Sequence, residues 1–433
     1  MVKTLKKELS TTALTFFVVG DILGAGIYSV TGKVAGLASY QTWLSFVCAM
    51  VAAGLTGLSY AELGSRYPKA GGESFFSLKA FEDESLSLIV GWLVLFSGVA
   101  SAATVSHAFA AYVGSCFTFI PVSLLIVGFL ITLAVVNYIG INESSKVNII
   151  CTTIEATGLL IVILSGTYFI LENKEANNLI QTVTIPTQVD SWVGILQGAT
   201  LAFFSFIGFE DLVNVAEEAK TPEKSLPTAI IIALSITGAF YFFISIIATS
   251  VVDPVVLSKS DAPLMLVVNH AFKGFPTTLF IVIGVFAITN TALLNNVMAS
   301  RLLFGMANQK LVPNKLEHLS PTKKTPTFAI VTVTGLSIVF SLVQDLEFLA
   351  QTTSLLILAV FIVINASLFK MKLSPKKYVS KGDYWKCPKY VPLLGVACCA
   401  ALMAFASKSE FLVFVIVLGV GLVLVAARKL RPN

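Results

Sequence analysis

Residues 18–28 read VVGDILGAGIY, an apolar stretch that is interrupted by one aspartate, Asp21, and by three glycines. A second interrupted stretch, residues 203–210, reads FFSFIGFE and ends in Glu210. A membrane-spanning helix tolerates breakers and charges mainly where its backbone lines a cavity within the protein. The glycines of either stretch alone are equally compatible with close helix packing. Together, the two stretches predict a pair of interrupted helices that build an internal site.

The composition predicts a membrane protein. Of the 433 residues, 56% are apolar and only 12% are charged, whereas soluble chains carry about a quarter charged residues. No Asp, Glu, Lys or Arg occurs in residues 85–142, 225–252 or 274–300, and roughly 20 apolar residues suffice to cross a bilayer. These runs lack the alternating polar faces of a soluble core. We therefore expect an all-α membrane protein, and no soluble enzyme.

The apolar runs divide the chain into about twelve expected membrane-spanning helices. The interrupted stretches fall in the first and the sixth of them. Helices that are five positions apart cross the membrane in opposite directions, so the pair predicts an inverted repeat with a site at its centre. The expected spans are residues 11–34, 40–63, 85–114, 120–140, 148–171, 191–213, 226–251, 275–304, 326–344, 348–369, 390–407 and 411–427.

The basic residues predict the orientation. If the N-terminus is cytoplasmic, 24 of the 29 lysines and arginines lie on the cytoplasmic side, and the other five are Lys33, Lys174, Lys259, Lys273 and Lys408. This bias predicts a multi-pass plasma-membrane protein with both termini in the cytoplasm. It also accounts for the net charge of +5 without a nucleic-acid partner. None of the six cysteines has the spacing of a metal site, so we expect no metal and no cofactor.

Four carboxylates fall well inside the expected spans: Asp21, Glu155, Glu210 and Asp211. A buried charge is costly unless it is paired, hydrated or neutralised, so each is a candidate functional group. The alternative for each is a protonated, hydrogen-bonded structural carboxyl. The free N–H groups of an unwound helix suit a carboxylate, and its free C=O groups suit an ammonium. A site that offers both favours a zwitterion, and an α-amino acid is the simplest candidate.

Five motifs in order resemble those of one transporter family. They are Gly24–Tyr28, Ser59–Leu63, Tyr67–Glu73, Phe204–Glu210 and Ser300–Ala307. On these motifs the chain resembles, over nearly its whole length, the amino acid–polyamine–organocation transporters, and within them the amino acid permeases with the leucine-transporter-like fold. The resemblance implies one transporter domain over residues 1–433. That domain would hold two inverted repeats of five helices, at 11–171 and 191–369, with discontinuous helices 1 and 6, and two additional helices at 390–427.

The resemblance also implies roles for individual residues. The backbone of Leu23–Gly26 is expected to receive the substrate carboxylate, and the carbonyl groups near Ile22, Phe206 and Ile207 its amino group. An aromatic residue, Phe204 or its neighbour Phe203, is expected to close over the substrate, unless it faces lipid or the core. The expected substrate-binding residues are Asp21, Ile22, Leu23, Gly24, Ala25, Gly26, Phe204, Ser205, Phe206, Ile207 and Gly208.

The expected ion-coupling residues are Glu155, Thr289 and Glu210. Thr289, with Asn290 or Thr291, matches the part of span eight that lines a sodium site in sodium-coupled relatives, although a mid-helix threonine often only bonds its own helix. Many proton-coupled relatives carry a lysine at the position of Glu155, so their mechanism does not carry over. Glu155 either accepts the coupling proton, which we favour, or helps to ligate sodium near Thr289.

Asp21 is a second departure from the family pattern, because relatives usually have a neutral residue there. A carboxylate at that position predicts a cationic substrate, either a basic amino acid or an amine that lacks a carboxylate. His107, alone in the third span, is either a proton relay or a hydrogen-bonded packing residue.

The leading functional prediction is secondary active transport of amino acids by alternating access, as symport that is coupled to protons or, alternatively, to sodium. Polyamine or amine transport and amino acid exchange remain alternatives, and the oligomeric state is open. A substrate-gated channel and a nutrient sensor are the competing classes outside transport. No nucleophile–base pair or phosphate-binding loop indicates an enzyme.

Overall fold

The computed structural model describes residues 9–68, 72–115, 117, 119–139, 145–173, 178–308, 312–323, 325–378 and 383–429. All regular elements of this described part are helices, and one isolated bridge joins Leu9 to Ala219. The first basic residues, Lys3, Lys6 and Lys7, and part of the motif at 67–73 lie outside it.

The elements follow one another with short connections. They are α1 (Thr11–Leu23), α2 (Ala25–Ala38), η1 (Ser39–Gln41), α3 (Thr42–Arg66), α4 (Gly72–Phe81), α5 (Glu84–Gly114), α6 (Val122–Ile139), α7 (Ser145–Glu172), α8 (Leu179–Val183), α9 (Val189–Ala202), η2 (Phe203–Phe206), η3 (Phe209–Glu218), α10 (Pro222–Val251), α11 (Pro254–Ser258), α12 (Pro263–Ala271), α13 (Thr277–Asn308), η4 (Asn314–Glu317), α14 (Thr327–Val343), α15 (Leu346–Leu373), α16 (Val391–Ala404) and α17 (Lys408–Lys429).

Among the described residues, nine helical segments are long and apolar enough to cross a membrane. The first, Thr11–Arg66, is 56 residues long, more than twice the roughly 20 residues that one crossing needs. Two shorter apolar helices, α14 and α16, coincide with the expected spans at 326–344 and 390–407. The prediction of an all-α, multi-pass membrane protein is confirmed.

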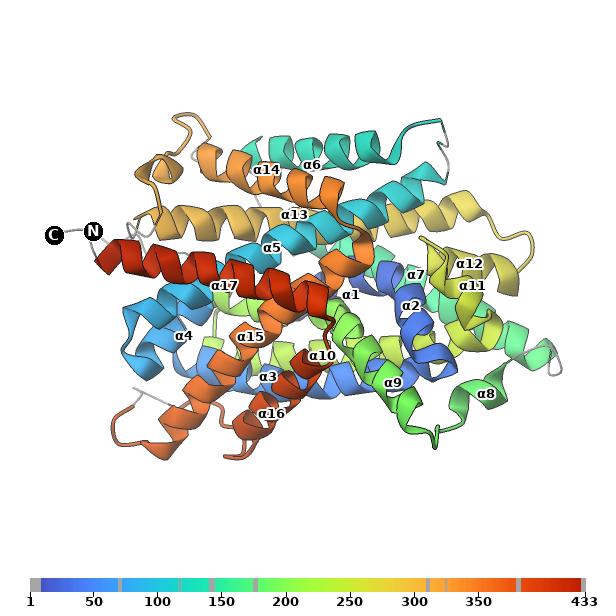
Figure 1. Cartoon of the computed structure of the whole chain (residues 1–433), viewed down its shortest axis with the longest axis horizontal. Helices are drawn as coiled ribbons and strands as arrows, with labels where there is room; N and C mark the ends of the chain where they lie inside the picture. Colours follow the sequence, from blue (N-terminus) through green and yellow to red (C-terminus); the bar gives the residue numbers. More distant parts are fainter. Residues whose placement is uncertain are drawn as a thin grey trace.

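The long helices lie side by side along the long axis of the molecule, with α6 and α14 at one edge and α3 and α16 at the other (Figure 1). Burial follows this arrangement: 78% of the span window in Thr11–Arg66 is buried, against 28% in α6 and in α17. The peripheral helices expose large apolar side chains such as Leu124 and Leu412. A contiguous apolar outer surface of this kind marks contact with a membrane.

Local signals in the sequence set several helix ends. The carboxylate of Asp83 accepts from the Ser85 N–H at 2.8 Å and begins α5, and Asp345 accepts from the Phe348 N–H at 2.8 Å and begins α15. Side-chain caps of this kind satisfy backbone donors that a helix start leaves free. Helices α10, α11 and α12 each begin with a proline, which has no N–H to leave unsatisfied. The short helices α11 and α12 lie between the expected spans at 226–251 and 275–304.

A buried polar cluster ties α3 to the end of α15. Lys372 of α15 pairs with Glu62 of α3, and the same carboxylate oxygen accepts from the Cys387 N–H at 2.8 Å. One turn further along α3, Arg66 donates to the carbonyl oxygen of Tyr378. A buried ion pair holds well only when its remaining hydrogen-bonding groups also find partners. The segment that follows α15 is thereby held against the end of α3.

Candidate functional site

The first interrupted helix is broken at Gly24, between α1 and α2. No side chain fits there, because a Cβ atom on Gly24 would lie 1.6 Å from the Oγ1 of Thr291 in α13. The Ala25 N–H donates to the same hydroxyl at 3.3 Å. Helix α13 thus provides a partner for one backbone donor that the break leaves without an intrahelical acceptor. The break falls where the glycines predicted it.

The second interruption separates η2 from η3. Ile207 is extended, with φ −67° and ψ 140°, and Gly208 has a φ of +129°. Residues with a Cβ atom rarely adopt such a positive φ, so glycine is required at the turn. The polypeptide that continues α9 therefore stops being helical at the position predicted from the stretch at 203–210.

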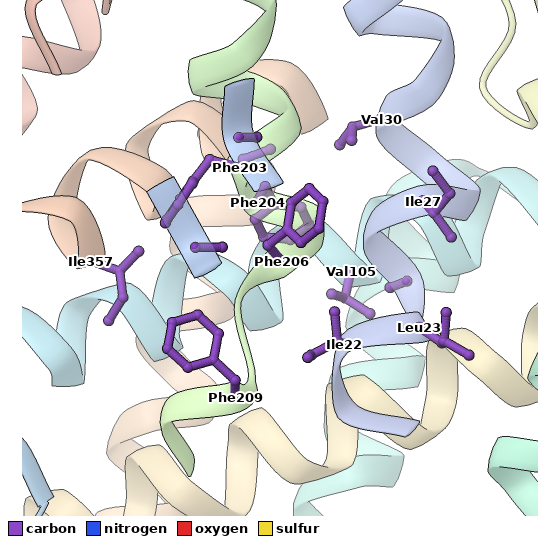
Figure 2. Close-up of a cluster of buried hydrophobic side chains, with 14 of the residues drawn as sticks. Ile22, Leu23, Ile27, Val30, Val105, Phe203, Phe204, Phe206, Phe209 and Ile357 are labelled. Atoms are coloured by element: carbon purple, nitrogen blue, oxygen red, sulfur yellow. The ribbon is translucent and has the colours of Figure 1, made fainter. Parts of the chain in front are cut away.

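The two interruptions touch one another. A Cβ atom on Gly26 would lie 2.5 Å from the Cα of Ser205, and one on Gly208 would lie 2.9 Å from the Cγ of Asp21. Figure 2 shows the phenylalanines of η2 and η3 opposite Ile22 of the first broken helix. Glycine at both positions lets two backbones approach more closely than side chains would permit.

Tyr241 of α10 bridges the two broken helices through its hydroxyl group. Its hydroxyl lies against the carbonyl oxygen of Ile22 and is 2.9 Å from that of Ser205. A tyrosine hydroxyl has one hydrogen to donate, so two carbonyl oxygens share it. One of these carbonyl groups therefore retains capacity for another donor, such as an ammonium group. The residue is fully buried and packs edge-on against Phe206 at a ring distance of 5.0 Å.

A small cavity of about 20 Å³ lies between the interruptions. Six of the expected substrate-binding residues line it, together with Ser101 of α5 and Thr291 and Asn295 of α13. The lining residues are Asp21, Ile22, Gly26, Ser101, Phe204, Ile207, Gly208, Thr291 and Asn295. Of the two candidate aromatic lids, Phe204 borders this cavity, whereas Phe203 is fully buried and packs on Phe361.

A larger cavity of about 340 Å³, called here the vestibule, adjoins the small one. Ser101, Ile207 and Asn295 line both cavities, so they form the partition between them. Asn295 donates to the Ser101 hydroxyl at 2.9 Å across this partition. From there the vestibule extends along α5 and α13 to Glu73 of α4 and to Met306 near the end of α13. The small cavity is therefore reached from the side of the molecule on which α4 lies, called here the α4 side.

The vestibule is acidic. Three carboxylates, those of Glu73, Glu210 and Asp211, line it together with one basic residue, Arg301. Burial raises the pKa of Glu73 to about 7, while its hydrogen bond from the Tyr60 hydroxyl, at 3.0 Å, acts in the opposite direction. Glu73 therefore titrates in the physiological range. An acidic cavity of this kind attracts cations and repels anions.

Asp21 is the charged residue nearest the centre of the site. Its side chain is 4% exposed and borders the small cavity. Among the described residues, its Oδ2 atom has no hydrogen-bond partner. Glu210, by contrast, accepts from the Gly208 N–H at 2.8 Å. A buried carboxylate oxygen without a partner is costly, so its place at a cavity indicates a site for a donor or a cation.

Glu155 of α7 lies beside the same broken helix and is fully buried. Its Oε1 accepts from the Asn290 side-chain amide at 3.1 Å, and its backbone carbonyl accepts from the Tyr28 hydroxyl at 2.9 Å. Its Oε2 has no partner among the described residues. Asn290 thus contacts Glu155 and Thr291 contacts the broken helix, whereas Thr289 makes no side-chain hydrogen bond in the described part of the chain.

His107 lies apart from this site. Its Nε2 is 2.8 Å from the carbonyl oxygen of Ser341 in α14, and it lines neither cavity. The packing interpretation explains this contact without a proton relay.

Three residues at the site were not predicted from the sequence: Tyr241, Ser101 and Asn295. Each occurs in a long apolar helix, where a single polar residue does not reveal which face of the helix meets the broken segments. Asn295 has the clearest signal, because an amide in the middle of a span needs a partner inside the protein.

Comparison with known proteins places the whole chain in one family. Residues 9–425 match the amino acid permease family model. The branched-chain amino acid permease BcaP of Bacillus subtilis is 27% identical, over 98% of this chain and 93% of the relative. The cationic amino acid transporter 9, chloroplastic, of Arabidopsis thaliana is 28% identical, over 99% and 78%. The methylthioribose transporter of Bacillus subtilis is 25% identical, over 97% and 92%.

The family match covers nearly the whole chain, and the spans and paired interruptions provide the architecture that such a transporter needs. The chain therefore belongs to the amino acid permease family and is a multi-pass amino acid transporter of the amino acid–polyamine–organocation superfamily.

Proposed function

We propose that this permease imports small cationic amino acids by proton-coupled symport, with alternating access to the cavity between its two interrupted helices. The observation that carries this proposal is the buried Oδ2 atom of Asp21, which borders the substrate cavity and has no partner among the described residues. An organic ammonium or guanidinium group supplies both the charge and the donor that this atom lacks.

The proposed topology has twelve crossings, with the repeats at 11–171 and 191–369 inverted relative to one another. Thr11–Arg66 is long enough for two crossings, so the nine long segments and the two shorter apolar helices together provide twelve. The two interruptions fall in the first and sixth of these crossings, which run in opposite directions in this topology. The distribution of basic residues supports a cytoplasmic location of both termini and of the α4 side. A bacterial relative of nearly equal length supports the plasma membrane as the location.

Substrate is proposed to bind the broken helices through its α-amino and α-carboxylate groups. The N-terminus of α2, where the Ala25 N–H already donates to Thr291, offers the N–H groups that follow Ala25 and a positive dipole end to the carboxylate. The carbonyl oxygens of Ile22 and Ser205, which share one tyrosine hydrogen, offer an acceptor to the amino group. Asp21 then remains for the additional positive charge of the side chain.

The relatives are named for different substrates, so their names do not identify the substrate of this chain. Branched-chain amino acids, cationic amino acids and methylthioribose all occur among those names. Asp21 itself favours the cationic class. An amine without a carboxylate is the second candidate, because three carboxyl groups, those of Asp21, Glu210 and Asp211, line the small cavity and the vestibule.

Replacing Asp21 with asparagine is expected to lower the preference for arginine or putrescine over alanine by at least about tenfold, because a charge-assisted hydrogen bond contributes about 1.5–3 kcal/mol. The amide keeps the size of the side chain beside Gly208 and removes its charge. Competition of the three unlabelled compounds against labelled substrate measures the preference. Asp190→Asn, which neutralises an exposed carboxylate at the start of α9, is the matched control. An unchanged preference in the Asp21 variant contradicts a cationic substrate.

Proton coupling is proposed to act through Glu155. The atom that faces its Oε1 is the side-chain amide nitrogen of Asn290, which donates to a carboxyl oxygen and, unlike the oxygen of the same amide, does not ligate sodium. Its unpartnered Oε2 leaves a place for one proton. Sodium coupling requires several converging oxygen ligands, and Thr289 makes no side-chain hydrogen bond with Glu155 among the described residues.

Uptake into liposomes that contain the purified protein tests the mode of transport. Labelled arginine, alanine, leucine and putrescine are offered with an imposed pH gradient, with a sodium gradient, or with internal substrate. We expect accumulation of arginine under the pH gradient. Uptake that needs internal substrate identifies an exchanger, and accumulation under the sodium gradient alone assigns the coupling to sodium.

Replacing Tyr241 with phenylalanine is expected to raise the KM for uptake by about tenfold and to change the maximal rate less. The change leaves the buried carbonyl oxygens of Ile22 and Ser205 without their donor, at a cost of about 1–3 kcal/mol. Tyr112→Phe is the control, because Tyr112 is equally buried and also donates to a backbone carbonyl group, but this group belongs to Tyr28, which lines neither cavity, whereas Ile22 lines the small one. Equal KM values in the two variants contradict a positioning role for Tyr241.

A further inference from the structure

A second pocket lies on the α4 side, away from the substrate path. It has a volume of about 190 Å³ and is formed by α4 and the segment that follows α15, with Lys79, Glu82, Lys377 and Tyr378 in its wall. Helices α3 and α15 end at Arg66 and Leu373, a few residues before these wall-forming segments. Because both helices belong to membrane-spanning segments, the pocket lies at the level of the lipid headgroups.

Positive charge exceeds negative charge around this pocket. The Lys377 ammonium lies 3.0 Å from the Glu82 carboxylate, and both side chains are largely exposed. Lys79 is exposed and makes no ion pair within the described residues, and the Lys370 ammonium lies 4.5 Å above the ring of Phe81. Lys377 above all, and then Lys370 and Lys79, lower the pKa of Glu82. Lys79 and Lys377 line the pocket beside one carboxylate, that of Glu82, and the Lys370 ammonium stands over the neighbouring Phe81, so the pocket has a net positive charge.

The pocket also has an apolar wall, formed by Phe75 and Leu78. Leu78 is 38% exposed, although it stands beside exposed lysines. A free phosphate ion gains nothing from such a wall. A phospholipid gains from both parts, because its phosphate group meets the lysines while its glycerol and first acyl carbons cover the apolar side chains.

We propose that this pocket binds the phosphate group of an anionic phospholipid of the cytoplasmic leaflet. The orientation of this inference rests on the proposed topology, in which the α4 side faces the cytoplasm. Anionic lipids concentrate in that leaflet and attract basic groups close to the membrane surface. The lipid enters in place of Glu82 as the partner of Lys377 and adds Lys79 and Lys370 as further partners.

The bound lipid holds two segments together, and one of them, α4, borders the transport path. The Tyr378 hydroxyl already donates to the Ala80 carbonyl at 2.8 Å, and the Tyr378 carbonyl accepts from Arg66. The same helix α4 brings Glu73 to the vestibule. A headgroup between Lys79 and Lys377 therefore joins α4 to the segment after α15, and it stabilises the wall of the vestibule.

Thermal unfolding of the purified full-length protein in detergent tests this proposal. Phosphatidylglycerol or phosphatidylcholine is titrated into separate samples, and the rise in melting temperature gives the half-saturating lipid concentration. We expect phosphatidylglycerol to stabilise the protein and phosphatidylcholine to do so much less. The double variant Lys79→Gln/Lys377→Gln is expected to need at least about tenfold more phosphatidylglycerol, because each lysine near the surface contributes to anionic lipid binding.

Two further variants make the result decisive. Lys389→Gln, an exposed lysine of the segment before α16 that lies outside the pocket, is expected to behave as the unmodified protein. Glu82→Gln removes the competing carboxylate and is expected to bind phosphatidylglycerol more tightly, which a general loss of folding cannot imitate. Equal responses to both lipids, an equal effect of inorganic phosphate, or a double variant that matches Lys389→Gln overturns the proposal. This readout does not depend on uptake, so failure of the proposed transport function leaves it interpretable.

Discussion

Replacing Gly26 with alanine is expected to lower the rate of transport by about tenfold to a hundredfold, since overpacking against atoms that cannot yield costs about 1–3 kcal/mol. The added methyl group would lie 2.5 Å from the Cα of Ser205. That atom belongs to the backbone of the second interrupted helix, so no side-chain rotation relieves the clash. The two interruptions must then move apart, and the cavity between them loses its shape.

The matched control is Gly54→Ala in α3. An added Cβ at Gly54 meets no atom within 4 Å, and alanine has the higher helix propensity of the two residues. Initial uptake rates in liposomes, normalised to the amount of monodisperse protein, measure the difference. Equal rates for the two alanine variants contradict the close approach of the two interruptions as a requirement for transport.

Replacing Glu155 with glutamine is expected to abolish accumulation driven by a pH gradient. The amide keeps the size of the side chain, but it does not exchange a proton with the medium in transport, so coupled movement of proton and substrate ends. Substrate exchange across the membrane, which needs no net proton movement, is expected to persist. Uptake with internal substrate and uptake with an imposed pH gradient separate the two activities in one preparation.

Asn290→Asp serves as a second test of the same group. It replaces the amide donor of Glu155 by a second carboxyl group at a contact distance of 3.1 Å, and two adjacent carboxyl groups hold a proton more tightly than one. The pH dependence of uptake should therefore move to higher pH. Unimpaired pH-driven accumulation in Glu155→Gln eliminates Glu155 as the coupling group.

The sequence was most informative about the backbone, because it predicted where the helices are interrupted and which segments span the membrane. Gly24 and Gly208 mark the interruptions because glycine permits close approach at the first and a positive φ at the second. The long apolar runs revealed the spans, because membrane-spanning helices need about 20 apolar residues. The short helices α11 and α12 were not predicted, because segments of five and nine residues that each begin with a proline resemble loops in the sequence.

Contacts between side chains of different helices were harder to predict from the sequence. In a helix that is apolar on every face, hydrophobic periodicity does not distinguish the face that meets the site from the face that meets lipid. Asn295 and Tyr241 therefore appear only in the folded chain, where they border or brace the substrate site. For the same reason, the sequence did not distinguish among Thr289, Asn290 and Thr291. In the described part of the chain, Asn290 donates to Glu155 and Thr291 accepts from the broken helix, whereas Thr289 makes neither hydrogen bond.

The partition formed by Ser101, Ile207 and Asn295 has a kinetic consequence. It lies between the small cavity and the vestibule, so in this conformation the substrate site is turned toward the α4 side. In the proposed topology this side is cytoplasmic, and solute that has accumulated in the cell then rebinds this conformation and delays its return to the outside. The proposed import is therefore expected to show trans-inhibition, a fall in the rate of uptake as the internal solute concentration rises.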